Sequence, residues 1–160
     1  IGARGTRMTP QKGFDLVQCV LDELMDSEDM AFVLLGTGNA EYEDFMRSAE
    51  WRHKGRLCAY IGYDEALSHR VYAGSDFLLM PSSFEPCGLS QMIAMRYGTL
   101  PIVRETGGLR DSVQPYNRFT GEGTGFSFAN FNANELADTI RRALALYHDD
   151  HDAYCRVQRQ

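Results

Sequence analysis

A length of 160 residues and a hydrophobic content of 44% predict one globular domain that is large enough to bury a core. The formal net charge of −6 argues against a nucleic-acid partner, because phosphate backbones are bound by clustered Lys and Arg side chains. No apolar run approaches the roughly 20 residues that cross a bilayer, and no signal peptide is visible.

The four cysteines are far apart and form no C-x-x-C pair: Cys19, Cys58, Cys87 and Cys155. This spacing predicts neither a zinc site nor a disulfide framework. We therefore expect reduced thiols in the cytosol, or in a plastid if the source is a plant.

The first two thirds of the chain alternate between apolar runs and helical repeats. Residues 1–5 are too short and too rich in glycine for a complete strand, so we expect the chain to begin partway into one and to continue as a loop over residues 6–13. Apolar side chains at helical spacing then predict a helix that begins at Phe14. Further strands are predicted at residues 31–35, 57–61, 77–80 and 100–103, and further helices at residues 40–51, 64–73 and 90–97. This alternation predicts the α/β class, with a doubly wound, Rossmann-like parallel sheet in a single domain over residues 1–160.

The last third departs from this alternation. Residues 115–130 are rich in Gly, Asn and Phe, and a loop of this length in a compact domain is usually functional or mobile. Amphipathic spacing from Leu136 to Tyr147 predicts a helix whose N-cap is Asn132 or Asn134. The polar end of the chain, residues 149–160, stops without a terminator signal.

The stretch over residues 81–91 compresses the end of a strand, a tight turn and the start of a helix. Its proline and glycine residues break both helix and strand. The amides of Gly88, Leu89 and Ser90, together with the helix dipole, favour an anion and above all a phosphate. Glu85 stands at the mouth of this turn, where a carboxylate does not suit anion binding alone, so we expect it to act on another part of the ligand. The alternative is a plain strand–helix turn with an exposed Glu85.

Polar or glycine-rich turns follow every predicted strand. Ligands of open parallel sheets bind beyond the carboxyl ends of the strands, so these turns are expected to converge on one edge: residues 6–13, 36–39, 62–63, 82–88 and 106–109. Residues 36–41 also resemble half of a dinucleotide-binding fingerprint. Because Glu41 stands where that fingerprint has Gly or Ala, a dehydrogenase is disfavoured.

Individual side chains in these turns are candidates for ligand binding. Arg7 and Lys12 carry charge that suits a diphosphate, although two lone cations in a loop are more often solvated surface. Tyr63 could stack on a base or could simply be a packed aromatic. Cys87 is disfavoured as a nucleophile, since no histidine is near it in the sequence and the four histidines form no visible triad.

Several motifs occur in a fixed order along nearly the whole chain. Residues 7–13 read R-M-T-P-Q-K-G, residues 84–91 read F-E-P-C-G-L-S-Q, and residues 94–103 read A-M-R-Y-G-T-L-P-I-V. The T-G-G-L-x-D motif of residues 106–111 and G-T-G-F of residues 123–126 follow. Taken together, these motifs resemble those of the starch and glycogen synthase family of retaining glycosyltransferases, which have the GT-B fold.

The resemblance implies that the chain is the C-terminal donor-binding half of a GT-B enzyme and that the N-terminal domain is absent. The family transfers glucose from a nucleotide sugar, usually ADP-glucose in bacteria and plants, to the nonreducing end of an α-1,4-glucan. We therefore expect a hexosyltransferase that binds ADP-glucose or ADP and, in the full enzyme, a glucan acceptor, with no transfer by this chain alone. The alternatives are a nucleotide-binding module without activity, or another GT-B transferase that uses UDP-glucose.

The resemblance also assigns roles to residues. The expected catalytic residues are Glu85, Arg7 and Lys12. Arg7 and Lys12 are expected to hold the donor phosphates, Tyr63 to stack on the adenine, and Glu85 to face and bind the sugar. In the turn after Glu85, the substrate-binding residues are expected to be Cys87, Gly88, Leu89 and Ser90. No metal or other cofactor is implied, since Arg7 and Lys12 can neutralise the diphosphate charge. Many retaining GT-B enzymes carry a second Glu where this chain has Ile93, a difference that favours the synthase branch.

Overall fold

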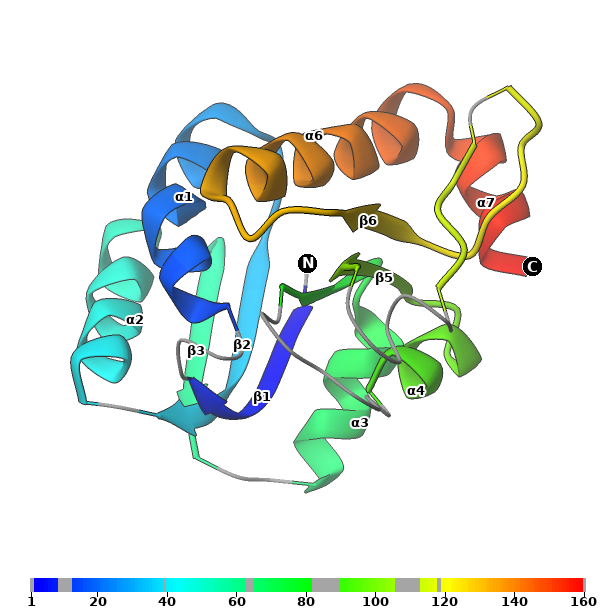
Figure 1. The fold of residues 1–160 in the computed structure, drawn as a ribbon. Helices are drawn as coiled ribbons and strands as arrows, with labels where there is room; N and C mark the ends of the chain where they lie inside the picture. Colours follow the sequence, from blue (N-terminus) through cyan, green and yellow to red (C-terminus); the bar gives the residue numbers. More distant parts are fainter. Residues whose placement is uncertain are drawn as a thin grey trace.

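The computed structural model describes residues 2–8, 13–38, 40–62, 65–81, 90–105, 113–117 and 119–159. These residues form a parallel sheet with helices on both faces, as Figure 1 shows. The strands are β1 (Gly2–Met8), β2 (Phe32–Gly38), β3 (Leu57–Ile61), β4 (Phe77–Met80), β5 (Leu100–Arg104) and β6 (Phe126–Phe128). The helices are α1 (Phe14–Ser27), α2 (Ala40–Arg52), α3 (Glu65–Gly74), α4 (Ser90–Arg96), α6 (Ala133–Asp149) and α7 (His151–Arg159).

The strand order reverses at the centre of the sheet. The six strands lie in the order β3-β2-β1-β4-β5-β6, and every ladder between them is parallel. From β1 the chain therefore winds outward to β3, returns to β4 beside β1, and winds outward again to β6. This is the doubly wound α/β architecture that the alternating sequence pattern predicted, with a topological switch point between β1 and β4.

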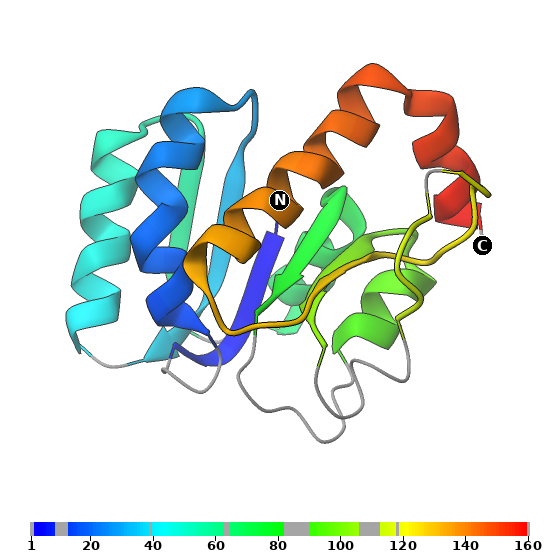
Figure 2. The same cartoon turned by 45° about the horizontal axis from the view of Figure 1, so that its top comes forward.

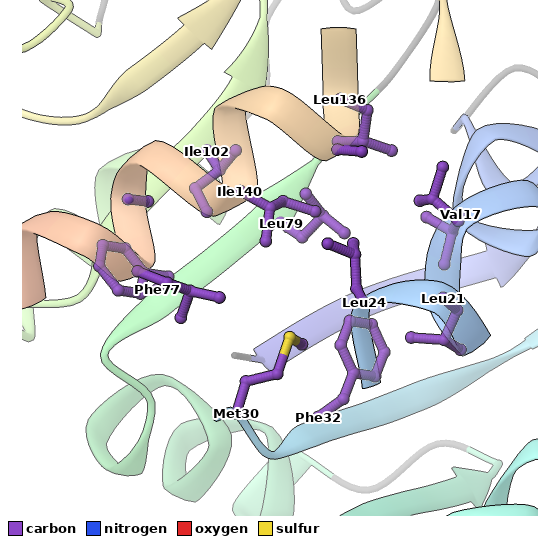
Figure 3. Packing of buried hydrophobic residues seen from close by; sticks show 14 of the residues in the cluster. Val17, Leu21, Leu24, Met30, Phe32, Phe77, Leu79, Ile102, Leu136 and Ile140 are labelled. Atoms are coloured by element: carbon purple, nitrogen blue, oxygen red, sulfur yellow. The ribbon is translucent and has the colours of Figure 1, made fainter. Parts of the chain in front are cut away.

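The larger hydrophobic core lies between the sheet and the helices α1, α2 and α6. Apolar side chains of α1 and α6 meet those of the central strands, as the labelled side chains in Figure 3 show. Phe77 and Ile102 of β4 and β5 are almost fully buried, as are Leu24 of α1 and Leu136 of α6. Burial of each such side chain contributes about 1.5–3 kcal/mol to folding, so this layer fixes how α1 and α6 sit on the sheet.

A smaller core covers the opposite face of the sheet, beneath α3 and α4. It joins Tyr72 of α3 and Ala94 of α4 to Leu78 and Val103 of the strands. Buried Thr99 donates a hydrogen bond to the carbonyl of Tyr72 in α3, just before β5 begins. Both faces of the central strands are therefore covered, as continuous apolar strands require.

Three strands differ from the sequence-based expectation. β1 extends through Met8, because Met8 pairs with Gly38 after a register shift, so residues 6–8 are strand where a loop was predicted. β2 likewise continues to Gly38 where residues 36–38 were expected to end it. The region of residues 115–130, predicted to be loop throughout, contains β6, which was missed because it is only three residues long.

The polar end of the chain also forms a helix, α7, where no element had been assigned. Its sequence carries few apolar residues, but Ala153, Tyr154 and Val157 are buried, and Tyr154 and Val157 belong to the larger core. The phenol of Tyr154 donates a hydrogen bond of 3.0 Å to the carbonyl oxygen of Asp76, and burial raises its pKa. Tertiary contacts therefore stabilise α7 more than its own sequence pattern does.

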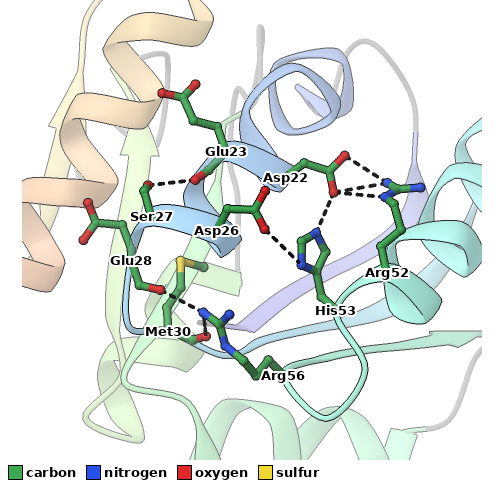
Figure 4. A network of polar contacts seen from close by, with 9 residues as sticks. All are labelled: Asp22, Glu23, Asp26, Ser27, Glu28, Met30, Arg52, His53 and Arg56. Atoms are coloured by element: carbon green, nitrogen blue, oxygen red, sulfur yellow. Dashed lines mark hydrogen bonds and ion pairs between the residues drawn. The ribbon is translucent and has the colours of Figure 1, made fainter.

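A polar network ties the C-terminal end of α1 to the segment between α2 and β3 (Figure 4). The Asp22 carboxylate accepts hydrogen bonds from Arg52 at 3.0–3.2 Å and lies 2.6 Å from Nε2 of His53. Arg56 donates to the backbone carbonyls of Glu28 and Met30. Residues 22–30 precede β2 and residues 52–56 precede β3, so the network lies at the amino edge of the sheet. There it holds the C-terminal end of α1 in place.

Among the described helices, none has both the length and the apolar character needed to cross a membrane.

The N-cap of α6 is Asn132, the first of the two residues that the sequence offered. Its side-chain oxygen accepts hydrogen bonds from the backbone N–H groups of Asn134 and Glu135, at 2.8 and 3.2 Å. These bonds satisfy two donors that would otherwise lack a partner within the helix.

We expect Asn132→Ala to lower the free energy of unfolding by about 1 kcal/mol, because the two N–H groups lose their acceptor. Asn134→Ala is the matched control, since Asn134 contributes its backbone N–H and not its side chain to the cap. Urea denaturation of the two variants measures the difference. Equal losses in both variants would contradict the assignment of the cap.

Candidate functional site

The carboxyl ends of the strands meet at one edge of the sheet. Met8 at the end of β1 pairs with Gly38 at the end of β2, and Gly36 pairs with Ile61 at the end of β3. On the other side of the switch point, Met80 at the end of β4 pairs with Val103 in β5. The turns that carry the candidate residues follow these ends directly in the chain, so the expected convergence on one edge agrees with the sheet.

Most of the candidate site residues lie outside the part of the chain that the structure describes. Arg7 is an exception and lies in β1, next to its final residue, and not in a loop as expected. Ser90 is a second exception and is the first residue of α4. The candidates outside the described residues are Lys12, Tyr63, Glu85, Cys87, Gly88 and Leu89.

A backbone contact joins the start of α1 to the end of β4. Gly13, the N-cap of α1, has a φ of 79°, in the left-handed region that glycine adopts without strain. A Cβ atom at Gly13 would lie 2.0 Å from the carbonyl oxygen of Pro81, the residue that follows β4. In the chain, residue 12 directly precedes Gly13 and residue 82 directly follows Pro81. The contact therefore brings together the two described residues, Gly13 and Pro81, that adjoin the segments carrying Lys12 and Glu85 in the chain.

The beginning of α1 is also anchored to α2. The Tyr42 hydroxyl of α2 donates a hydrogen bond to the carboxylate of Asp15, and the rings of Tyr42 and Phe14 pack edge to face with centroids 4.9 Å apart. The hydrogen bond raises the pKa of Tyr42 to about 12, so the phenol remains a donor at neutral pH. Tyr42 and Phe14 are both buried. Together these contacts fix where α1 begins and hence where the preceding turn must end.

The turn after β2 is closed by a side chain of the protein itself. The backbone N–H of Gly38 donates a hydrogen bond of 3.0 Å to a carboxylate oxygen of Glu43 in α2. In a dinucleotide-binding turn, this type of backbone group faces the pyrophosphate. The occupied amide agrees with the sequence-based argument against a dehydrogenase.

Two charged residues at the end of β5 were not singled out from the sequence. The guanidinium of Arg104 lies over the ring of Phe131, 5.7 Å from its centroid. The neighbouring Glu105 accepts a hydrogen bond of 2.9 Å from the hydroxyl of Ser127. Arg104 therefore adds a positive charge to the carboxyl edge. The sequence could have identified them by their position, because both charged residues lie between the predicted apolar strand and the T-G-G-L motif.

The histidines of the described chain have separate partners. His53 contacts Asp22, His69 lies 3.1 Å from the hydroxyl of Tyr97, and the other two contact backbone carbonyls of Asp29 and Tyr147. No group of three His, Cys, Asp or Glu side chains that could hold a metal ion occurs among the residues that the structure describes.

The fold and the motif-bearing edge place the chain in a known class. The sequence profile of the group 1 glycosyl transferases matches residues 6–158. The chain therefore belongs to the group 1 glycosyl transferases.

Within this family the chain is similar to bacterial glycogen synthases. It is 61% identical over 142 residues to a glycogen synthase of Geobacillus thermodenitrificans, a match that covers 89% of this chain and 29% of the relative. It is 53% identical over 145 residues to a glycogen synthase of Finegoldia magna, covering 91% of this chain and 31% of the relative. The chain thus spans about 30% of the length of the curated relatives that it matches.

Solved structures agree with this assignment. The catalytic domain of starch synthase IV from Arabidopsis thaliana, bound to ADP and acarbose, matches with a TM-score of 0.86 and 36% identity over 98% of this chain and 33% of that chain. A sucrose-phosphate synthase from Thermosynechococcus elongatus matches with a TM-score of 0.74 at 22% identity, over 99% of this chain and 39% of that chain, and supports the fold alone. The expected GT-B half-fold is confirmed.

We expect Gly13→Ala to destabilise the protein by about 2–4 kcal/mol, because a left-handed backbone strain and a steric clash with the Pro81 carbonyl add together. Gly55→Ala is the matched control. Gly55 also has a positive φ, of 87°, but a Cβ atom there meets nothing within 4 Å, so only the strain of about 1–2 kcal/mol is expected. Urea denaturation compares the two, and equal losses would show that the contact with Pro81 imposes no constraint.

Proposed function

We propose that the chain is the C-terminal, donor-binding domain of a glycogen synthase. In the whole enzyme it would bind ADP-glucose for transfer of glucose, with retention, to the nonreducing end of an α-1,4-glucan. The observation that carries the proposal is the 61% identity to a glycogen synthase over 89% of this chain. The ADP bound to the related starch synthase IV supports an adenine nucleotide as the donor's leaving group.

The chemistry of the reaction explains the charge of the proposed site. When ADP departs, its diphosphate gains a further negative charge that must be stabilised while the anomeric carbon becomes positive. In the proposal, Arg7 and Lys12 neutralise the diphosphate, and the turn of residues 87–90 seats the distal phosphate at the start of α4. No metal ion is required in this arrangement, because the cations and backbone N–H groups supply the positive potential.

Glu85 has the complementary role in the proposal. A carboxylate near the sugar ring stabilises the developing positive charge or orients the sugar through its hydroxyl groups. The contact between Gly13 and Pro81 supports this role, because it holds Pro81, four residues before Glu85 in the chain, against the start of α1. Cations for the leaving group and a carboxylate for the sugar would then lie on either side of the breaking bond.

A second candidate function is a nucleotide-binding module without transferase activity of its own. The observation that favours it is the share of the relatives that the chain spans, which is about 30%. The two candidates are compatible, since half of a cleft can bind a donor without excluding water or presenting an acceptor. A titration with ADP and UDP, together with a glucan-elongation assay of this chain and of a full-length relative, tests both. Glucan elongation by the chain alone would contradict the module, and failure to bind ADP would contradict both.

We expect Lys12→Ala to weaken ADP binding roughly 10- to 150-fold, because a charge-assisted contact to phosphate contributes about 1.5–3 kcal/mol. Adenosine, which has no phosphate, should bind the variant and the unmodified chain equally. Lys54→Ala is the matched control, since Lys54 is exposed at the amino edge between α2 and β3. Calorimetric titration measures the affinities of the unmodified chain and of the two variants for ADP and for adenosine. Equal losses for ADP and adenosine would show that Lys12 does not contact the phosphates.

We expect Glu85→Gln, introduced into a full-length glycogen synthase that carries this domain, to lower kcat by about 10²–10³ with little change in the donor KM. The amide keeps the size and hydrogen-bonding capacity of the side chain but removes the negative charge that the transition state needs. Steady-state kinetics at saturating glucan, with a thermal melt to verify folding, provide the measurement. A natively melting variant with unchanged kcat would remove Glu85 from the catalytic residues, and a rise in KM alone would restrict it to ground-state binding.

A further inference from the structure

An open groove lies between α6 and the glycine-rich segment that precedes β6. Its volume is about 980 Å³, near the top of the range of about 300–1,000 Å³ that small-molecule sites occupy. One wall is the segment of residues 113–117 and 119–125, called the aromatic loop below. The other wall is the C-terminal half of α6, with Arg142, Ala145 and Leu146, and the floor includes Phe126 of β6.

The groove is remote from the proposed transfer site. Phe126 is the first residue of β6, and the groove meets α6 near its C-terminal end, so both features belong to the amino edge of the sheet. In Figure 1 the aromatic loop lies beside α7 and the end of α6, and Figure 2 shows it well away from the carboxyl end of β1. A ligand in this groove would therefore leave the carboxyl edge open.

Internal hydrogen bonds hold the aromatic loop in shape. The side-chain oxygen of Asn117 accepts from the backbone N–H groups of Phe119 and Thr120, at 2.9 and 3.3 Å. The backbone of Tyr116 donates to the carbonyl of Gly125 at 2.8 Å. Gly123 packs so closely that a Cβ atom there would lie 2.5 Å from the Cα of Tyr116. The loop is thus preformed, which lowers the entropic cost of binding a ligand.

The loop presents an aromatic side chain to solvent. The Phe119 side chain is 84% exposed, which is unusual for a phenylalanine on a loop that is otherwise tightly bonded to itself. Tyr116, in the same groove, is partly buried and packs against the ring of Phe126 with centroids 5.9 Å apart. One aromatic ring therefore lies fixed within the groove while a second stands at its rim.

The polar lining of the groove has both hydrogen-bond donors and acceptors in planar side chains. Gln114 and Glu122 line it, and within the described part of the chain neither side chain makes a hydrogen bond. Asp150 also lines the groove, and Arg142, the cationic side chain among the described lining residues, pairs with Asp138 at 3.2 Å. Among the described lining residues, the carboxylates of Glu122 and Asp150 stand beside a paired Arg142, a balance of charge that favours a neutral ligand over a phosphate.

The combination of an exposed ring and planar polar groups fits a neutral carbohydrate. A sugar ring offers C–H groups on its faces, which pack on the electron-rich face of an aromatic ring, and hydroxyl groups along its edge, which pair with carboxylates and amides. A purely apolar ligand would leave these polar groups without partners, at a cost in free energy. The size of the groove suits an oligosaccharide better than a single sugar.

We propose that this groove is a second binding site, which takes a segment of an α-1,4-glucan chain away from the transfer site. The choice of an α-1,4-glucan among carbohydrates rests on the proposed function, whereas the assignment of a carbohydrate rests on the groove itself. A second site on the same polymer would raise the local concentration of glucan chain ends near the transfer site without taking part in the reaction.

The test uses maltoheptaose as the probe and this chain as the protein. We expect maltoheptaose to shift the backbone NMR signals of residues 114–122 and Phe119→Ala to weaken its binding about tenfold, in line with the loss of a stacking aromatic. Trp51→Ala is the matched control, because Trp51 is also exposed, at 76%, but lies on α2 far from the groove in sequence and in Figure 1. Phe119→Tyr should retain binding, since a tyrosine ring can stack in the same way.

The experiment tests the groove and the donor-binding function separately. ADP added to the same samples should leave maltoheptaose binding unchanged, because the two ligands use opposite edges of the sheet. Equal affinity of Phe119→Ala and the unmodified chain would overturn the second site, as would equal losses in Phe119→Ala and Trp51→Ala. Cellohexaose bound as tightly as maltoheptaose would overturn the choice of an α-glucan. A chain that binds maltoheptaose but not ADP would refute the donor-binding function and leave the groove assignment intact.

Discussion

The geometry of the carboxyl edge depends on one backbone contact, between Gly13 at the start of α1 and the carbonyl of Pro81 at the end of β4. β1 and β4 are the two central strands, where the winding of the sheet changes direction. The contact crosses this switch point, so it fixes how closely the start of α1 approaches the end of β4. Only glycine satisfies both the left-handed φ and the absence of a Cβ atom there. The anchoring of Phe14 and Asp15 by Tyr42 holds the same position from the other side.

The two edges of the sheet have different chemistry. At the amino edge, acidic and basic side chains such as Asp22 and Arg52 are paired with one another and with backbone carbonyls, and they stabilise the packing of α1. At the carboxyl edge, the motifs that resemble those of glycogen synthases follow the strand ends. This division is what a doubly wound sheet favours, since stability can be concentrated at one edge and ligand binding at the other.

The sequence predicted the architecture well because the core strands are strongly apolar. The strands at residues 57–61 and 77–80 have the predicted bounds, and the first predicted helix begins at Phe14. The prediction failed where tertiary contacts outweigh local pattern. β6 has three residues and pairs with β5, and α7 is held by the burial of Tyr154. The convergence of the site on one edge could be predicted from the parallel topology alone. The contribution of Arg104 could not, because it depends on where β5 ends against Phe131.

The strand order also has a consequence for the way the chain acquires its fold during synthesis. β1 precedes the other strands of the sheet in the chain and can pair with β2 as soon as β2 emerges, but its other side pairs with β4, whose Leu78 lies opposite Gly2. Until the chain has grown that far, a central strand exposes a row of unpaired backbone groups beside a nascent apolar layer. Such an edge readily pairs with other chains. That edge of β1 therefore stays open to pairing with other chains until β4 has been made.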